Sequence, residues 1–281
     1  MRPESSSPPN SAIELRPLPA RRRKALRDLG TRAGRERRGL YLLEGPKAIE
    51  DALARGAAIR WLAGSPEGEP ALARWARTGL LPPGTELYRA SPAEIEDFAD
   101  TVTPQGVLAV GEIPPAGLDA LSADLGRVVL LVDGIQDPGN LGTLIRTLAA
   151  VGGRAAICVK GTVDPFNPKA LRGAAGATFA ISVAFGLERP ATVEWCANRG
   201  VRIVALEAGA PNLFRAHAPA APLALAVGGE SSGLSTEILD RSAAVVGLPM
   251  EAGVESLSAA VAGSIALYAL AHDLASRGGE R

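Results

Sequence analysis

Short apolar runs alternate with segments of helical periodicity along most of this chain. Runs of this length that contain β-branched residues and are bounded by glycines are typical of buried parallel strands. In the second half of the chain the pattern predicts strands at residues 128–132, 155–159, 181–183, 201–206, 223–227 and 243–246. Helical segments lie between most of them, and this alternation favours an α/β fold with a parallel, doubly wound sheet.

A smaller α/β unit precedes this one. It has apolar strands at residues 40–43, 59–63, 86–89 and 106–110. Pro46 suits the first turn of a helix, and Ser91 with Glu94 predicts a helix cap. We therefore divide the chain into a disordered tail at 1–20, a first domain at 21–112, a linker at 113–125 and a second domain at 126–281.

Two glycine-bearing loops organise the second domain. One spans residues 228–235 and follows the strand at 223–227, and the other spans 247–258 and follows the strand at 243–246. Ligands bind at the carboxyl ends of strands in open α/β sheets, and glycines let main chain approach a ligand closely. Two such loops at neighbouring strand ends predict a pocket whose walls are largely main chain.

A third segment, at residues 133–147, follows the strand at 128–132. Asp137 and Pro138 predict a helix start, and Leu141, Leu144 and Ile145 give it an apolar stripe. A side chain on this helix points back toward the strand end, which aims Arg146 at the pocket edge. The residue pattern alone also allows Arg146 to be an ordinary surface arginine.

The charge is balanced over the whole chain but not locally. The formal net charge is +0, and aromatic residues make up only 4%, which argues against broad stacking platforms for single-stranded nucleic acid. A basic segment nevertheless follows the predicted tail, and its arginines are Arg21, Arg22, Arg23, Arg32, Arg35, Arg37 and Arg38. Concentrated positive charge attracts phosphate, so we predict RNA-binding residues here. A solvated helix face is the alternative.

Other kinds of site find little support. Cys158 and Cys196 lie in unrelated contexts and are expected to be buried apolar residues. His217 and His272 make no zinc spacing, so no metal is predicted, and neither a dinucleotide-binding nor a P-loop glycine pattern is present. The apolar segment at 257–271 is too short for a membrane span and fits a core or subunit-interface helix. We expect a cytoplasmic protein.

Together, three segments resemble the SpoU (TrmH-like) family of RNA ribose 2′-O-methyltransferases, within the SPOUT superfamily. They are Asn140-x-Gly142-x-x-x-Arg146-Thr147, Gly228-x-Glu230-x-x-Gly233-Leu234-Ser235 and Leu248-Pro249-Met250-x-x-Gly253-x-x-Ser256-Leu257. The first domain, through residues 32–45 and 103–109, resembles the family's substrate-binding domain, which is similar to ribosomal proteins.

The resemblance implies a trefoil knot in the parallel-sheet SPOUT domain, a homodimer formed through that domain, and a small α/β domain that binds RNA. It implies S-adenosylmethionine as cofactor, with cofactor-binding residues Gly228, Gly229, Glu230, Leu248, Met250 and Leu257. Asn140, Arg146, Glu230 and Ser256 would form or support the catalytic site. Ser258 departs from the family, which usually has asparagine there, and serine offers one hydroxyl in place of an amide.

The implied reaction is methylation of a ribose 2′-hydroxyl in RNA. Ribosomal RNA is favoured over tRNA because of the first domain. An arginine is normally always protonated, so Arg146 is expected to position the substrate rather than to act as a base. The competing hypothesis, kept open by Ser258, is an RNA-binding or assembly factor with weak or no transferase activity.

Overall fold

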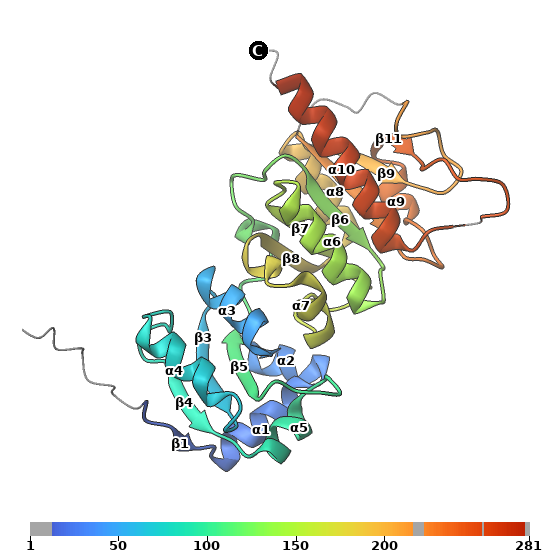
Figure 1. The fold of residues 1–281 in the computed structure, drawn as a ribbon. Helices are drawn as coiled ribbons and strands as arrows, with labels where there is room; N and C mark the ends of the chain where they lie inside the picture. The colour runs from blue at the N-terminus through green and yellow to red at the C-terminus, as the bar shows by residue number, and fades with distance from the viewer. Residues whose placement is uncertain (1–12, 216–221, 255, 279–281) are drawn as a thin grey trace, which may run out of the picture.

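The computed structural model describes residues 13–215, 222–254 and 256–278 and contains two α/β domains (Figure 1). Each domain is built on its own sheet. The first sheet has five strands in the order β1-β4-β3-β5-β2, and the second has six strands in the order β11-β9-β10-β6-β7-β8. The expected α/β class and the parallel second sheet are confirmed, since every pairing in that sheet is parallel.

The first domain follows the predicted element order. Its strands are β1 (Arg16–Pro17), β2 (Leu40–Glu44), β3 (Ile59–Gly64), β4 (Glu86–Arg89) and β5 (Val107–Glu112). Its helices are α1 (Ala20–Leu29), α2 (Arg32–Arg38), α3 (Pro46–Ala54), α4 (Glu69–Arg77) and α5 (Pro92–Phe98). The cap predicted at Ser91 is a full capping box with Glu94.

The predicted tail is too long. Residues 1–12 lie outside the described part of the chain, but Arg16 and Pro17 form β1 and pair in parallel with β4. Leu18 is 2% exposed and packs with Leu26, Trp61 and Tyr88 in the first domain's core. The proline-rich composition suggested disorder, whereas a single buried leucine and an open sheet edge anchor this segment.

The second domain carries the parallel sheet. Its strands are β6 (Val129–Asp133), β7 (Ala155–Val159), β8 (Ser182–Leu187), β9 (Arg202–Leu206), β10 (Leu223–Gly228) and β11 (Ser242–Val246). Its helices are α6 (Pro138–Ala150), α7 (Pro168–Ala174), α8 (Arg189–Asn198), α9 (Thr236–Leu239) and α10 (Ala259–Gly278), with short 3-10 turns η1 (Leu118–Ala120) and η2 (Ala177–Phe179).

Helices cover both faces of the second sheet. Leu144 of α6 and Leu267 of α10 share a core with Leu130 and Val227 on one face. Val193 of α8 and Ile238 of α9 pack against residues on the other face. Helices α6 and α10 therefore lie side by side on the same face, as Figure 1 shows.

The two glycine loops are not on neighbouring strands, contrary to the prediction. Strand β9 lies between β10 and β11 and pairs in parallel with both. Sequence runs do not specify strand order, so the insertion of β9 could not be read from periodicity. Its consequence is that the end of β9 contributes to the pocket.

The last helix is long and apolar. The segment Ala259–Ser276 has a mean hydropathy of 1.3 and could cross a membrane by length and composition alone. Its Ala266, Leu267, Leu270 and Ala271 are nevertheless buried in the core shared with α6 and β10. The helix is therefore longer than predicted from residues 257–271, and its packing agrees with a core helix, which was one of the two predicted alternatives beside a subunit-interface helix.

The two domains share a buried contact. Phe166 and Leu171, from the second domain, belong to the same core cluster as Tyr41 in β2. The rings of Tyr41 and Phe166 stack with centroids 5.7 Å apart, and Phe166 meets Phe185 of β8 edge-on at 5.5 Å. Leu121, within the predicted linker, is buried against the second sheet.

Candidate active site

A cavity of about 490 Å³ opens at the carboxyl ends of β9 and β10 and beside the start of α10. Its size falls in the range usual for small-molecule sites, about 300–1,000 Å³. It is lined by Leu206, Glu207, Ala208, Val227, Gly228, Gly229, Glu230, Gly233, Leu248, Met250, Ser256, Leu257, Ser258, Ala259 and Ala262. All the residues that the sequence assigned to cofactor binding thus line one cavity.

Close main-chain packing shapes the glycine loop of this cavity. A Cβ atom on Gly228 would lie 2.3 Å from the carbonyl carbon of Gly233, and one on Gly229 would lie 2.7 Å from the carbonyl oxygen of Gly134. Real Cβ atoms do not approach so closely, so a side chain at either position would force the loop apart. These two glycines let segments of main chain that form the cavity wall pack against each other.

The start of α6 reaches the same cavity. Asp137 caps the helix by accepting a 2.9 Å hydrogen bond from the Asn140 amide N–H, and this bond lowers the pKa of Asp137. The cap orients the first helical turn, and Nδ2 of Asn140 donates a hydrogen bond to Oε1 of Glu230. Residues 90 positions apart are thereby joined, as the motif pattern predicted.

Arg146 does not line the cavity. It lies on α6, on the same face of the sheet as α10, and its neighbour Thr147 makes a 2.9 Å hydrogen bond with Ser264 of α10. Its side chain is exposed, and within the described part of the chain no hydrogen bond or ion pair joins it to another residue. The structure thus brings together Asn140, Glu230 and Ser256 but leaves Arg146 apart.

Ser256, Leu257 and Ser258 form the cavity wall before α10. All three are exposed. Oγ of Ser258 accepts a 3.3 Å hydrogen bond from the Val261 amide N–H, so the residue that departs from the family pattern caps the first turn of α10. Serine is a preferred capping residue, which gives Ser258 a structural role.

Asp133, at the end of β6, is a buried anchor for the glycine loop that the sequence did not reveal. It is 2% exposed, and its Oδ2 accepts a 2.8 Å hydrogen bond from the Ser235 amide N–H. Its main-chain carbonyl accepts a 2.9 Å bond from the Gly229 amide N–H. One residue therefore holds both ends of the loop at residues 229–235.

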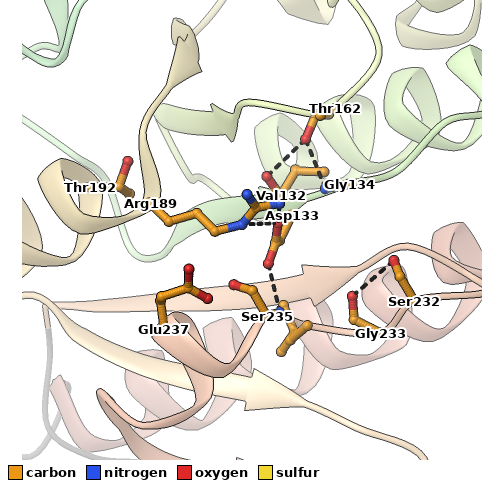
Figure 2. A network of polar contacts seen from close by, with 12 residues as sticks. Val132, Asp133, Gly134, Thr162, Arg189, Thr192, Ser232, Gly233, Ser235 and Glu237 are labelled. Atoms are coloured by element: carbon orange, nitrogen blue, oxygen red, sulfur yellow. Dashed lines mark hydrogen bonds and ion pairs between the residues drawn. The ribbon is translucent and has the colours of Figure 1, made fainter.

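An arginine from helix α8 pairs with the Asp133 carboxylate (Figure 2). Nε and Nη2 of Arg189, at the start of α8, donate to Oδ1 of Asp133 at 2.9 and 2.7 Å, and this contact raises the pKa of Arg189. Thr162 completes the network, since its hydroxyl donates to the Val132 carbonyl at 3.1 Å and accepts from the Gly134 amide at 3.0 Å. The strand end below the cavity is therefore rigidly bonded.

Glu207 is a second residue that sequence reasoning missed. It follows β9, lines the cavity and accepts a 3.1 Å hydrogen bond at Oε1 from the Leu234 amide N–H. The signal that could have found it is a lone acidic residue directly after an apolar strand. That signal became meaningful only once β9 was placed beside β10.

The basic segment is largely ion-paired, and one of its assignments is wrong. Arg35 is 2% exposed and forms a 2.6 Å ion pair with Asp164 of the second domain, so it is not available to bind RNA. The sequence did not show whether Arg35 would be exposed to solvent or buried in the contact between the two domains. Arg22 and Arg23 pair with Glu86 and Glu94, and Arg37 and Arg38 pair with Asp28.

Exposed cations nevertheless remain in this segment. Arg21 is exposed and makes no ion pair with another described residue, while Arg32 and Arg37 are 55% and 62% exposed despite their partners Glu36 and Asp28. Surface ion pairs contribute only about 0–1 kcal/mol, so they exchange readily for phosphate contacts.

His217 lies outside the described residues, and Cys158 and Cys196 are buried as expected.

Family comparisons match both domains. Residues 127–268 match the SpoU rRNA Methylase family, and residues 21–109 match an MRM3-like substrate binding domain. A 23S rRNA (guanosine(2553)-2′-O)-methyltransferase, RlmP of Bacillus subtilis, is 32% identical over 88% of this chain and 94% of its own length. The 23S rRNA (uridine(2479)-2′-O)-methyltransferase of Streptomyces viridochromogenes is 29% identical over 85% of each protein.

Solved structures agree with these matches. The SpoU methyltransferase AviRb of Streptomyces viridochromogenes, in complex with AdoMet, superposes with a TM-score of 0.82 at 27% identity and covers 92% of this chain and 99% of its own. The AdoMet-bound rRNA methyltransferase of Sinorhizobium meliloti gives a TM-score of 0.80 at 27% identity, with 93% and 98% covered. The similarity therefore extends through both domains.

Proposed function

The chain belongs to the SpoU rRNA methylase family, and from this membership we propose that it methylates a ribose 2′-hydroxyl of ribosomal RNA with S-adenosylmethionine as methyl donor. The observation that carries the proposal is that the second and third motifs line one cavity and that Asn140 of the first motif is bonded to Glu230 of that lining. Relatives that are named rRNA 2′-O-methyltransferases support the same reaction.

The cavity fits this cofactor. Val227, Leu248, Leu257 and Ala262 offer apolar surface suited to an adenine ring, and the glycine loop offers main chain. Glu207 and Glu230 supply acceptors for hydroxyl and amino groups. We assign cofactor binding to the predicted residues on this basis.

The chemistry is a direct displacement. When bound, S-adenosylmethionine would supply a methyl group on a positively charged sulfonium; the ribose oxygen would take that methyl group as the carbon–sulfur bond breaks with its electron pair on sulfur, and the hydroxyl proton would pass to solvent water. The chain's contribution is to orient the reacting groups. Asn140, held by the α6 cap, fixes the Glu230 carboxylate at the cavity mouth, and Ser256 borders the same opening.

We propose that Arg146 holds an RNA phosphate beside the reacting ribose. Its exposed position on α6 and its lack of a partner among the described residues leave its five donors free. Arg21, Arg32 and Arg37 on the first domain are the exposed cations suited to more distant phosphates. Arg22, Arg23 and Arg38 would contact RNA only by exchanging their ion pairs.

We also propose that the protein is a homodimer. A groove of about 690 Å³ runs along α10 and is lined partly by Phe214, Ile265 and Tyr268. Phe214 is 60% exposed and Tyr268 is 58% exposed, which is unusual for neighbouring aromatic residues. A second copy packed on this face would remove that apolar surface from water. We further propose that the second domain contains a trefoil knot and that the protein is cytoplasmic.

The test is to map ribose methylation on rRNA treated with the purified protein and S-adenosylmethionine. We expect one new 2′-O-methyl position with the wild-type chain and none with Asn140→Ala combined with Glu230→Ala. Calorimetry with S-adenosylmethionine distinguishes the proposed methyltransferase from the competing hypothesis of an RNA-binding assembly factor. Cofactor binding with an unchanged methylation map would favour an RNA-binding assembly factor.

A further inference from the structure

The cavity carries an uncompensated negative charge. Its titratable lining residues are Glu207 and Glu230, and no lysine, arginine or histidine of the described chain lines it. Glu230 is bonded to the neutral amide of Asn140, which leaves its charge in place. A recess with this lining attracts a cation and gives no advantage to a neutral ligand.

Glu207 is the more firmly held of the two carboxylates. Its Oε1 accepts from the Leu234 amide, and a Cβ on Gly233 would lie 3.5 and 3.6 Å from its two oxygens. Gly233 itself lines the cavity, so the carboxylate lies against the cavity wall rather than in open solvent. Among the described residues no cation forms an ion pair with it, and its side chain is half-buried.

We propose that Glu207 is a specificity-determining residue that favours the positively charged methyl donor over its demethylated product. This inference rests on the proposed function. Methyl transfer turns a sulfonium into a thioether, so the ligand loses one positive charge while its shape barely changes. A fixed carboxylate in a partly enclosed cavity therefore holds the donor more tightly than the product and speeds product release.

The experiment is calorimetry with three ligands of nearly the same shape. S-adenosylmethionine carries a sulfonium, sinefungin carries an amino group that is positively charged at neutral pH in its place, and S-adenosylhomocysteine carries a neutral sulfur. Glu207→Gln keeps the side-chain shape and an oxygen for the Leu234 amide but removes the charge. We expect it to weaken S-adenosylmethionine and sinefungin roughly 5- to 10-fold and S-adenosylhomocysteine less than about twofold.

Two further variants sharpen the result. Glu207→Asp keeps the charge and should preserve most of the donor-to-product ratio. Glu194→Gln removes an exposed carboxylate on α8, outside the cavity, and should leave all three dissociation constants unchanged. Equal weakening of the three ligands by Glu207→Gln, or no change in their ratio, would overturn the inference. Failure of the wild-type protein to bind S-adenosylmethionine would instead overturn the proposed function.

Discussion

At the scale of single residues, Arg146 is the residue whose observed position differs from the one that the motif predicts. The motif places it with Asn140, whereas the structure shows an exposed side chain outside the cavity. Asn140 is fixed by the helix cap and by Glu230. This exposed position outside the cavity agrees with the proposal that Arg146 contacts RNA rather than the cofactor.

Replacing Arg146 tests that placement. We expect Arg146→Ala to lower the methylation rate about 10²-fold, a size typical of a reacting group that is no longer correctly positioned, with the dissociation constant of S-adenosylmethionine unchanged. Arg146→Lys keeps the charge without the fork of donors, so it should lower the rate uniformly across pH. A displaced pH–rate profile in Arg146→Lys would show that the residue takes the hydroxyl proton.

Residues with a signature type and spacing could be predicted, and residues that act through topology could not. Gly228, Gly229 and Leu248 were assigned through the resemblance of their segments to the family motifs, and they do line the cavity. Asp133 and Glu207 each follow an apolar strand as one acidic residue, with nothing in the sequence to connect them to the loop at 229–235. Their roles depend on β6 and β9 flanking β10.

At the scale of elements, the loop at residues 229–235 is held by neighbouring strands as well as by its own 2.9 Å hydrogen bond from the Gly233 amide to the Gly229 carbonyl. Glu207 after β9 holds the Leu234 amide, and Asp133 at the end of β6 holds the Ser235 amide. Adjacent amides are thus bonded to carboxylates from the two strands that flank β10. Periodicity predicted these strands well, because each is a short apolar run, but it placed β10 beside β11.

Asp133→Asn tests this anchoring. The change removes the charge that pairs with Arg189, and a neutral amide cannot accept equally well from Arg189 and Ser235. Because Arg189 is about a third exposed, we discount the loss to about 2 kcal/mol of unfolding free energy, or roughly 4–8 °C in Tm. The dissociation constant of S-adenosylmethionine should rise about tenfold, since about 1.4 kcal/mol of loop order is lost.

The control for this variant is the residue that caps the carboxyl end of the helix that begins at Arg189. Arg199 is exposed, directly follows α8 and places its guanidinium over the ring of Trp195, outside the cavity lining, so Arg199→Ala should leave cofactor binding unchanged. Scanning calorimetry and titration calorimetry measure the two effects separately. A drop in Tm for Asp133→Asn without weaker cofactor binding would limit Asp133 to a structural role.

At the scale of the whole molecule, the two domains are joined by a buried charge pair and an aromatic cluster. Arg35 donates to Asp164 and to the Leu29 carbonyl, while Asp164 also accepts a 2.8 Å bond from the Phe166 amide. The same segment carries Thr162, which bonds to the end of β6 beneath the cavity. The first domain is therefore held in a fixed position relative to the active site.

The exposure of Arg32 and Arg35 could not be predicted from the sequence. Arg32 and Arg35 differ by one helical turn in α2, and nothing in their local sequence separates a cation facing solvent from one buried between domains. Arg32 is exposed, and Arg35 is covered by the second domain. Only the tertiary contact decides which arginine can reach RNA.

Arg35→Met tests the domain junction. It leaves the Asp164 carboxylate buried without its cation, a change that costs about 3–5 kcal/mol of stability. We expect Tm to fall and proteolysis within residues 113–125 to become faster. Adding Asp164→Asn removes the stranded charge but keeps the acceptor for the Phe166 amide, so the double variant should recover much of the loss.

RNA binding distinguishes Arg35 from its matched control, Arg32→Ala. The logarithm of RNA affinity falls with the logarithm of salt concentration by roughly 0.7–0.9 for each phosphate contact. Arg32→Ala should reduce that slope by about one contact while leaving Tm unchanged, because its ion pair with Glu36 is exposed. The Arg35→Met/Asp164→Asn double variant should keep the wild-type slope. A reduced slope in this double variant would place Arg35 on the RNA and show that the domain junction opens when RNA binds.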